Sequence, residues 1–210
     1  MTIDIHFLVL HISAITALYT VPVILLCWNT TLLQGIKSGI AVALGGTLSQ
    51  ILYGLIAIFH LVHFSISSLQ IVTIISGIGG CLLLYLGLRE FWLKGENHPR
   101  SYQAKFWLIV LLNFLVMSLN IQFNTASSIF FLPNYSTEKS ISYFLALCAL
   151  FIGFMSVWTI MVLITGVIKH FLSVQGQNYL RYLGGFCLAV YALWLVLGPV
   201  LFPLMFIRWC

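Results

Sequence analysis

The sequence has very little charge. Only 6% of its 210 residues are Asp, Glu, Lys or Arg, whereas 61% are hydrophobic. A water-soluble domain of this size carries about 25% charged residues, most of them on its surface. This composition excludes a water-soluble globular protein, because too few charged side chains are present to cover its surface. We therefore predict an integral membrane protein whose outer surface faces lipid.

Several motifs that carry chemistry are also missing. The five cysteines form no C-x-x-C pair and show no metal-ligand spacing. The chain has no nucleotide-binding loop, no nucleophile–base arrangement and no carboxylate pair. These absences argue against an enzyme, and we predict neither a cofactor nor a resident metal.

Long apolar runs account for most of the chain. A helix needs roughly 20 mostly apolar residues to cross the hydrocarbon core of a bilayer. Helices also satisfy their backbone hydrogen bonds internally, as lipid requires. The first run lacks the positively charged start of a secretory signal, so we interpret it as a retained span. The sequence predicts an all-α membrane protein with six transmembrane helices, at residues 5–28, 39–63, 69–92, 106–132, 141–168 and 181–207.

The basic residues are distributed unevenly along these spans. Of the nine Lys and Arg residues, all but Lys139 and Arg208 lie in the loops that follow spans 1, 3 and 5. Because loops rich in Lys and Arg stay in the cytoplasm, both termini are predicted to lie outside it. The excess of basic residues is thus a topological signal and not a nucleic-acid footprint, so no nucleic-acid partner is predicted.

The polar stretch 94–105 divides the single domain, 1–210, into halves 1–93 and 106–210. Each half holds three spans. Because three is an odd number, the second half starts on the opposite side of the membrane from the first, so the two halves are inverted relative to each other. Inverted repeats are common among secondary transporters. The segment 79–88, GGCLLLYLGL, also resembles the segment 184–193, GGFCLAVYAL. We therefore predict two inverted three-helix repeats joined by a cytoplasmic loop.

Two spans at corresponding positions of the halves are interrupted. Pro22 removes a backbone donor from the first span. The fourth span carries an unusual density of amide side chains before Pro133. Interruptions at matching positions indicate a binding site near the membrane midplane, whereas the simpler alternative is that these amides join neighbouring helices. We predict a substrate path that includes Pro22, Asn113, Asn120, Gln122 and Asn124.

Three short motifs point to a family. The segment 20–22, TVP, is similar to a Pro-Gly-Pro break, and 35–39, GIKSG, is similar to a Gly-basic-x-Gly entry to a second span. The segment 130–135, FFLPNY, is similar to an aromatic-Leu-Pro-Gln-Phe segment at the end of a fourth span. With these motifs the chain resembles the LysE/RhtB amino-acid exporters. The resemblance implies export of amino acids or similar small solutes by alternating access, across the bacterial inner membrane.

The chain departs from that family at the polar positions. Ser49 and Gln50 occupy the place of its Gly-Asp pair, Thr20 replaces the first proline, and its Asn-Pro-Lys motif has no counterpart. The resemblance implies that Thr20, Ser49 and Gln50 also line the path. No acidic residue lies deep in a span, so His11 and His60 are the candidate proton or ion site.

Other hypotheses remain open at this stage. One is export of a divalent metal through His6, His11, His60 and His63. Another is a membrane enzyme or thiol carrier that uses Cys27 and Cys148. A third is a degenerate homologue that serves as a non-transporting membrane subunit. The expected partners are the lipid bilayer and a small-molecule solute, and self-association to a homo-oligomer is left open.

Overall fold

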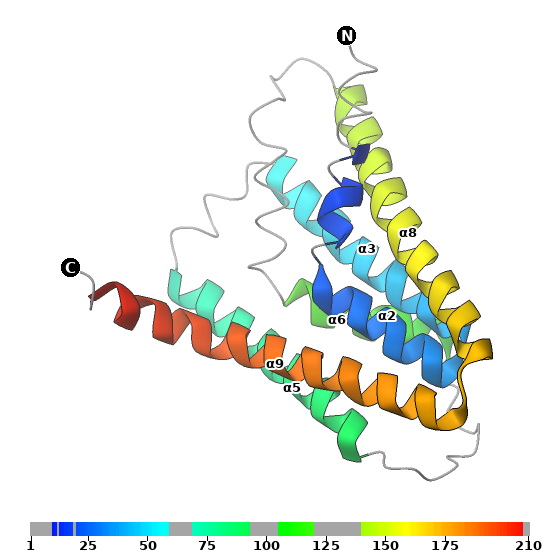
Figure 1. Ribbon diagram of the computed structural model, residues 1–210. Coiled ribbons are helices and arrows are strands. Elements are labelled where there is room, and N and C mark those ends of the chain that lie inside the picture. Colours follow the sequence, from blue (N-terminus) through cyan, green and yellow to red (C-terminus); the bar gives the residue numbers. More distant parts are fainter. Residues whose placement is uncertain are drawn as a thin grey trace.

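The described part of the chain is helical. The computed structural model describes residues 10–11, 13–18, 20–58, 69–92, 105–119 and 140–207. Within these residues a short helical segment at 13–18 precedes six longer helices (Figure 1). The longer helices are α2 (Val21–Gln34), α3 (Ile36–Ile58), α5 (Leu69–Trp92), α6 (Phe106–Ser118), α8 (Ser140–Phe171) and α9 (Val174–Ile207).

Among the described residues, three stretches are long and apolar enough to cross a membrane. They are Ile36–Ile56, Leu147–Phe171 and Val174–Leu197. Shorter apolar helical stretches are Val21–Gln34, Ile74–Arg89 and Phe106–Ser118. The structure thus agrees with a helical membrane protein. The count of six crossings and the inverted repeats stay predictions.

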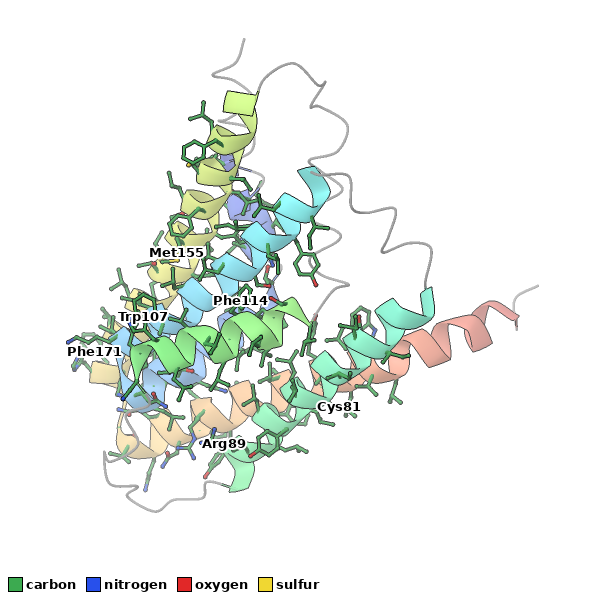
Figure 2. All side chains as sticks on the ribbon, turned by 180° about the vertical axis from the view of Figure 1, so that it is seen from behind. Cys81, Arg89, Trp107, Phe114, Met155 and Phe171 are labelled. Carbon is green, nitrogen blue, oxygen red and sulfur yellow. The ribbon has the colours of Figure 1, made fainter. Side chains whose placement is uncertain are left out.

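The outer surface of the helices is apolar. Phe171 is 85% exposed and Trp107 is 72% exposed, and both point away from the bundle (Figure 2). The same outward side of α6 and α8 carries exposed aliphatic side chains, among them Leu108, Leu111, Leu115, Ile152, Ile160, Leu163 and Val167. Soluble monomers rarely expose continuous apolar patches of this extent. This surface is suited to contact with lipid tails.

Helix α2 is the central element of the bundle. It packs against α3, α8 and α9, while α3 lies between α6 and α8, and α5 pairs mainly with α9. The aromatic side chains of Phe154 and Trp158 on α8 are buried in the middle, with ring centroids 5.1 Å apart. The α2–α3 turn and the α8–α9 turn lie together at one end of the molecule (Figure 1).

The helix bounds differ from the sequence prediction in several places. Helix α2 continues to Gln34, where the first span was predicted to end at residue 28, and α3 begins at Ile36 and not at residue 39, so Lys37 lies in a helix and not in a loop. Helix α5 has the predicted bounds, but α9 begins at Val174 and not at residue 181. The Ser173 hydroxyl accepts a hydrogen bond from the Gly176 backbone N–H (3.2 Å), as an N-cap residue does. Arg181, which the orientation argument placed in a loop, is therefore a buried residue of α9, and its guanidinium lies 5.3 Å from the Tyr182 ring centroid.

Candidate functional site

The first span is interrupted at Thr20. This residue lies outside helical geometry (φ −81°, ψ 64°), and Pro22 stands in the first turn of α2. A proline is tolerated there because the first N–H groups of a helix have no intrahelical partner. The Ala17 carbonyl at the break accepts hydrogen bonds from the Thr20 N–H (3.3 Å) and from the Trp158 indole Nε1–H (3.2 Å). A side chain of α8 therefore holds the break in place.

Polar residues of α3 are buried close to this break. Ser49 is fully buried, and Thr20 and Gln50 are each 4% exposed. Helices α2 and α3 are antiparallel, and a Cβ built at Gly46 would lie 3.0 Å from a methyl group of Val23. Gln50 lies one turn after Gly46 on α3, and Thr20 lies about one turn before Val23. Because the helices are antiparallel, Gln50 and Thr20 therefore lie at the same height along the bundle, which we call the same level. The predicted path residues of spans 1 and 2 therefore share one level of the bundle.

Helix α6 adds to the same level. The Ser118 hydroxyl donates to the Ser49 hydroxyl (3.4 Å), and the Tyr53 hydroxyl donates to the Ser118 carbonyl. We call Thr20, Ser49, Gln50, Tyr53 and Ser118 the polar layer. It consists of hydroxyls and one amide in an apolar bundle, and its Thr20 hydroxyl donates to the Thr16 carbonyl (3.0 Å).

Of the remaining predicted path and ion-site residues, the structure describes Asn113 and His11. Asn113 on α6 is half-buried, and its amide donates to the Ile109 carbonyl of the same helix (2.8 Å). A Cβ at Gly45 would lie 3.0 Å from the Asn113 Cβ, so this residue faces α3. His11 is exposed. The other predicted residues lie outside the described ones: Asn120, Gln122, Asn124 and His60.

A pocket of about 500 Å³ opens at the end of the bundle where the α2–α3 turn meets α6 and α8. Figure 2 shows Trp107 and Phe171 at this end, and each directly follows a lining residue in the sequence, Phe106 and His170 respectively. We call it the basic-end pocket because Lys37, Lys169 and His170 belong to its lining. Among the described residues, the lining is formed by Thr31, Gln34, Gly35, Ile36, Lys37, Ser38, Phe106, Gly166, Lys169 and His170.

Gly35 alone connects α2 to α3 and lines the basic-end pocket. Its backbone angles are φ 94° and ψ 177°, a region that essentially only glycine adopts. The Gly35 N–H bonds to the Thr31 carbonyl (3.0 Å), and the Gly35 carbonyl accepts from the N–H of Gly39 (3.2 Å). The pocket wall therefore depends on a backbone conformation that only this residue type supplies without strain.

Gly35→Ala is expected to lower the free energy of unfolding by about 1–3 kcal/mol, since alanine is strained at this φ and ψ. Gly77→Ala is the matched control. A Cβ finds nothing within 4 Å at either position, so only the backbone conformation differs. Thermal unfolding of the purified variants in detergent measures both. Equal melting temperatures for the two variants would show that the Gly35 backbone carries no strain penalty.

The metal and thiol hypotheses gain no site from the structure. Among the described residues, no group of three His, Cys, Asp or Glu side chains is arranged to hold a metal ion. The histidines at positions 6, 60 and 63 lie outside that part of the chain. Cys27 and Cys148 are free thiols, and Cys27 is fully buried with its Sγ 3.8 Å from the Gly39 carbonyl oxygen.

Sequence reasoning missed three features of the site. Trp158 was not singled out, although a tryptophan deep in an apolar span often needs a partner for its indole N–H. Asn29 is 4% exposed, and its side-chain amide has no hydrogen-bond partner among the described residues. It faces Gly184 of α9. The third feature is the basic-end pocket, whose lining comes from distant parts of the chain.

Comparison of the chain with protein-family models, with curated proteins and with solved structures finds no match. The likeness to the LysE/RhtB exporters therefore stays a prediction from the sequence motifs.

Proposed function

We propose that this chain is a multi-pass carrier of the bacterial inner membrane that exports amino acids or similar small solutes by alternating access. The observation that carries the proposal is the position of the break in the first span. Thr20, where the helix is interrupted, lies at the level of buried Ser49 and Gln50 inside a bundle with an apolar exterior. Irregular backbone at membrane depth is tolerated where it lines a cavity or is buried in protein.

The chemistry of this level suits a small polar solute. The N-terminal end of α2 lies at the break, and the positive end of a helix dipole attracts a carboxylate. The carbonyl of Ala17 lies on the other side of the break and is already bonded to the Thr20 N–H and to the Trp158 indole. The polar layer adds uncharged donors and acceptors. The proposed solute therefore binds with its carboxylate at the start of α2 and with its other polar groups against the polar layer.

The carrier is proposed to consist of two inverted repeats, and the α5–α9 pair supports this. When the segments 79–88 and 184–193 are aligned, Gly80 corresponds to Gly185, and Gly87 corresponds to Ala192. A Cβ at Gly80 would lie 3.4 Å from the Ala192 carbonyl oxygen, and a Cβ at Gly87 would lie 2.8 Å from that of Gly185. When each residue is replaced by its counterpart in the other segment, the Gly80–Ala192 contact becomes the Gly185–Gly87 contact. A two-fold axis between α5 and α9 would produce this pair of contacts.

The neighbouring contacts follow the same exchange. A Cβ at Gly79 of span 3 would lie 2.9 Å from the Leu119 carbonyl at the end of α6, in span 4. A Cβ at the corresponding Gly184 of span 6 would collide with Asn29 of α2, the helix that continues span 1 beyond its predicted end. Each glycine thus faces the first span of the other half. The pairing of α3 with α8, the middle spans of the two halves, is also consistent with inverted repeats.

Export is tested directly in whole cells. Cells with and without the protein are loaded with a mixture of dipeptides, and amino acids and organic acids released into the medium are quantified. The proposal predicts a selective rise of one solute class on expression. No change for any solute, with the protein confirmed in the membrane, would contradict export and favour a non-transporting membrane subunit.

A further inference from the structure

The side chain of Asn29 is buried in the bundle without a hydrogen-bond partner. It is 4% exposed, and neither its Nδ2 nor its Oδ1 bonds to any of the described residues. The nearby buried hydroxyl of Thr31 on the same helix, in contrast, donates to the Cys27 carbonyl (2.6 Å). A buried donor or acceptor that lacks a partner destabilises the state that contains it. The packing of α2 in this structure is therefore destabilised at Asn29.

Helix α9, which lies next to α2 in Figure 1, covers this amide. A Cβ built at Gly184 of α9 would lie 3.1 Å from the Asn29 Cγ and 3.2 Å from its Nδ2, and would collide with its Oδ1. Gly184 lies well inside α9, so its backbone N–H and carbonyl bond within the helix. The amide thus packs against backbone groups whose hydrogen bonds are already made. If α9 moved away from α2, water would reach the amide.

The helices on each side of this contact are packed closely to other partners. The Cys27 Sγ of α2 lies 3.8 Å from the Gly39 carbonyl oxygen of α3. A Cβ at Gly87 of α5 would lie 2.8 Å from the Gly185 carbonyl oxygen of α9 and 2.9 Å from the Ala189 nitrogen. The unsatisfied amide therefore lies between two closely packed pairs, α2 with α3 and α5 with α9.

The start of α9 is tied to the end of α8. The Gln177 amide of α9 donates to the Lys169 carbonyl (3.0 Å) and to the Leu172 carbonyl (3.2 Å). Gly184 is seven residues further along α9, which is about 10 Å at 1.5 Å per residue. The α8–α9 turn can therefore serve as a pivot while the part of α9 beyond it moves.

We propose that the contact between Asn29 and Gly184 is a gate. It opens when α9, with α5 attached, moves away from α2 about the α8–α9 turn, and the Asn29 amide then bonds to water. The unsatisfied amide raises the energy of the closed state and so increases the population of the open one. Asn29 lies on α2 between Thr20 of the polar layer and Gln34 of the basic-end pocket. Passage of the exported solute through this gate rests on the proposed function, whereas the opening itself is measured without a solute.

The reactivity of a cysteine at position 188 measures the opening. Leu188 is buried on α9, one turn after Gly184 and on the same face of the helix. Leu188→Cys is introduced into the full chain with its five cysteines replaced, and labelling by a water-soluble maleimide is timed in phosphatidylcholine nanodiscs. Asn29→Leu keeps a similar shape and removes both unsatisfied groups, which favours the closed state. It is expected to slow labelling about tenfold, which corresponds to about 1.4 kcal/mol.

Two further substitutions on α2 test the cause of this effect. Asn29→Asp keeps the shape but introduces a carboxyl group that is more costly to bury, so labelling at position 188 is expected to become faster. Thr31→Val is the matched control, because it is also a polar-to-apolar change at a buried position of α2. Its hydroxyl is satisfied within the helix, so labelling is expected to stay within about twofold.

Leu83→Cys distinguishes opening of the gate from general loosening of the bundle. Leu83 is fully buried on α5 between Gly80 and Gly87, which both contact α9. Because α5 and α9 move together, this position is expected to stay unlabelled.

Several outcomes would overturn the gate. They are an equal rate at position 188 with and without Asn29→Leu, slower labelling with Asn29→Asp, and labelling at position 83 as fast as at position 188. A chain that exports solutes but is never labelled at position 188 would overturn the gate and leave the proposed function intact. The expected labelling in a chain that exports nothing would support the gate and contradict the proposed function.

Discussion

Gly87→Val is expected to disrupt the pairing of α5 with α9. A Cβ at Gly87 would lie 2.8 Å from the Gly185 carbonyl oxygen and 2.9 Å from the Ala189 nitrogen. Both are backbone atoms, so the contact is relieved only if the helices separate. Overpacking of this kind costs about 1–3 kcal/mol, and we expect at least the upper end of this range. The loss is measured as the fall in melting temperature and in monodisperse yield from detergent.

Gly77→Val is the control on the same helix. A Cβ there meets nothing within 4 Å, so the substitution changes helix propensity without altering a helix contact. Its effect is expected to stay within about 0.5 kcal/mol, as is usual for substitutions away from packed features. If both variants lost the same stability, close approach of α5 and α9 at Gly87 would not hold this part of the bundle together.

Gln50→Leu is expected to reduce export about 10- to 100-fold. The side chain keeps a similar volume, but the amide of the polar layer is removed at the level of the break at Thr20. A tenfold change in rate corresponds to about 1.4 kcal/mol of transition-state stabilisation, within the range of one or two lost hydrogen bonds to a solute. The rate is measured in loaded cells and normalised to the amount of protein in the membrane.

Thr47→Val provides the matched comparison, because it is also a polar-to-apolar change at a buried position of α3. The Thr47 hydroxyl donates to the Ala43 carbonyl of its own helix (2.9 Å), and Thr47 is not part of the polar layer. Export by this variant is expected to stay within about twofold of the unaltered chain, since such local bonds contribute little. An equal loss in both variants would assign Gln50 a structural role.

Local signals in the sequence predicted much of the fold. The bounds of α5 are those predicted from its apolar run, and α6 begins at the predicted residue 106. Pro22 marked the break in the first span, because proline acts through its own missing N–H and ring. Ser49 and Gln50 were predicted as polar residues of the path; both are buried, and the path itself stays a prediction.

Features that depend on distant segments were not predictable in the same way. The contact of Trp158 with the Ala17 carbonyl joins residues on two different spans, and no local pattern encodes it. The basic-end pocket combines residues from the α2–α3 turn with Phe106 and Lys169. The early start of α9 was missed because the hydrophobic signal begins later, whereas Ser173 supplies the N-cap at its start.

Cysteine accessibility at position 50 tests most directly whether the polar layer faces a transport path. Gln50→Cys is introduced into a chain whose five cysteines are replaced, and cells are treated with a water-soluble maleimide. Leu52→Cys is the control, because Leu52 of the same helix lies on the apolar exterior. The account predicts labelling at position 50, slowed by the exported solute, and none at position 52. No labelling at position 50 would show that the polar layer is sealed inside the bundle, which contradicts a path through it.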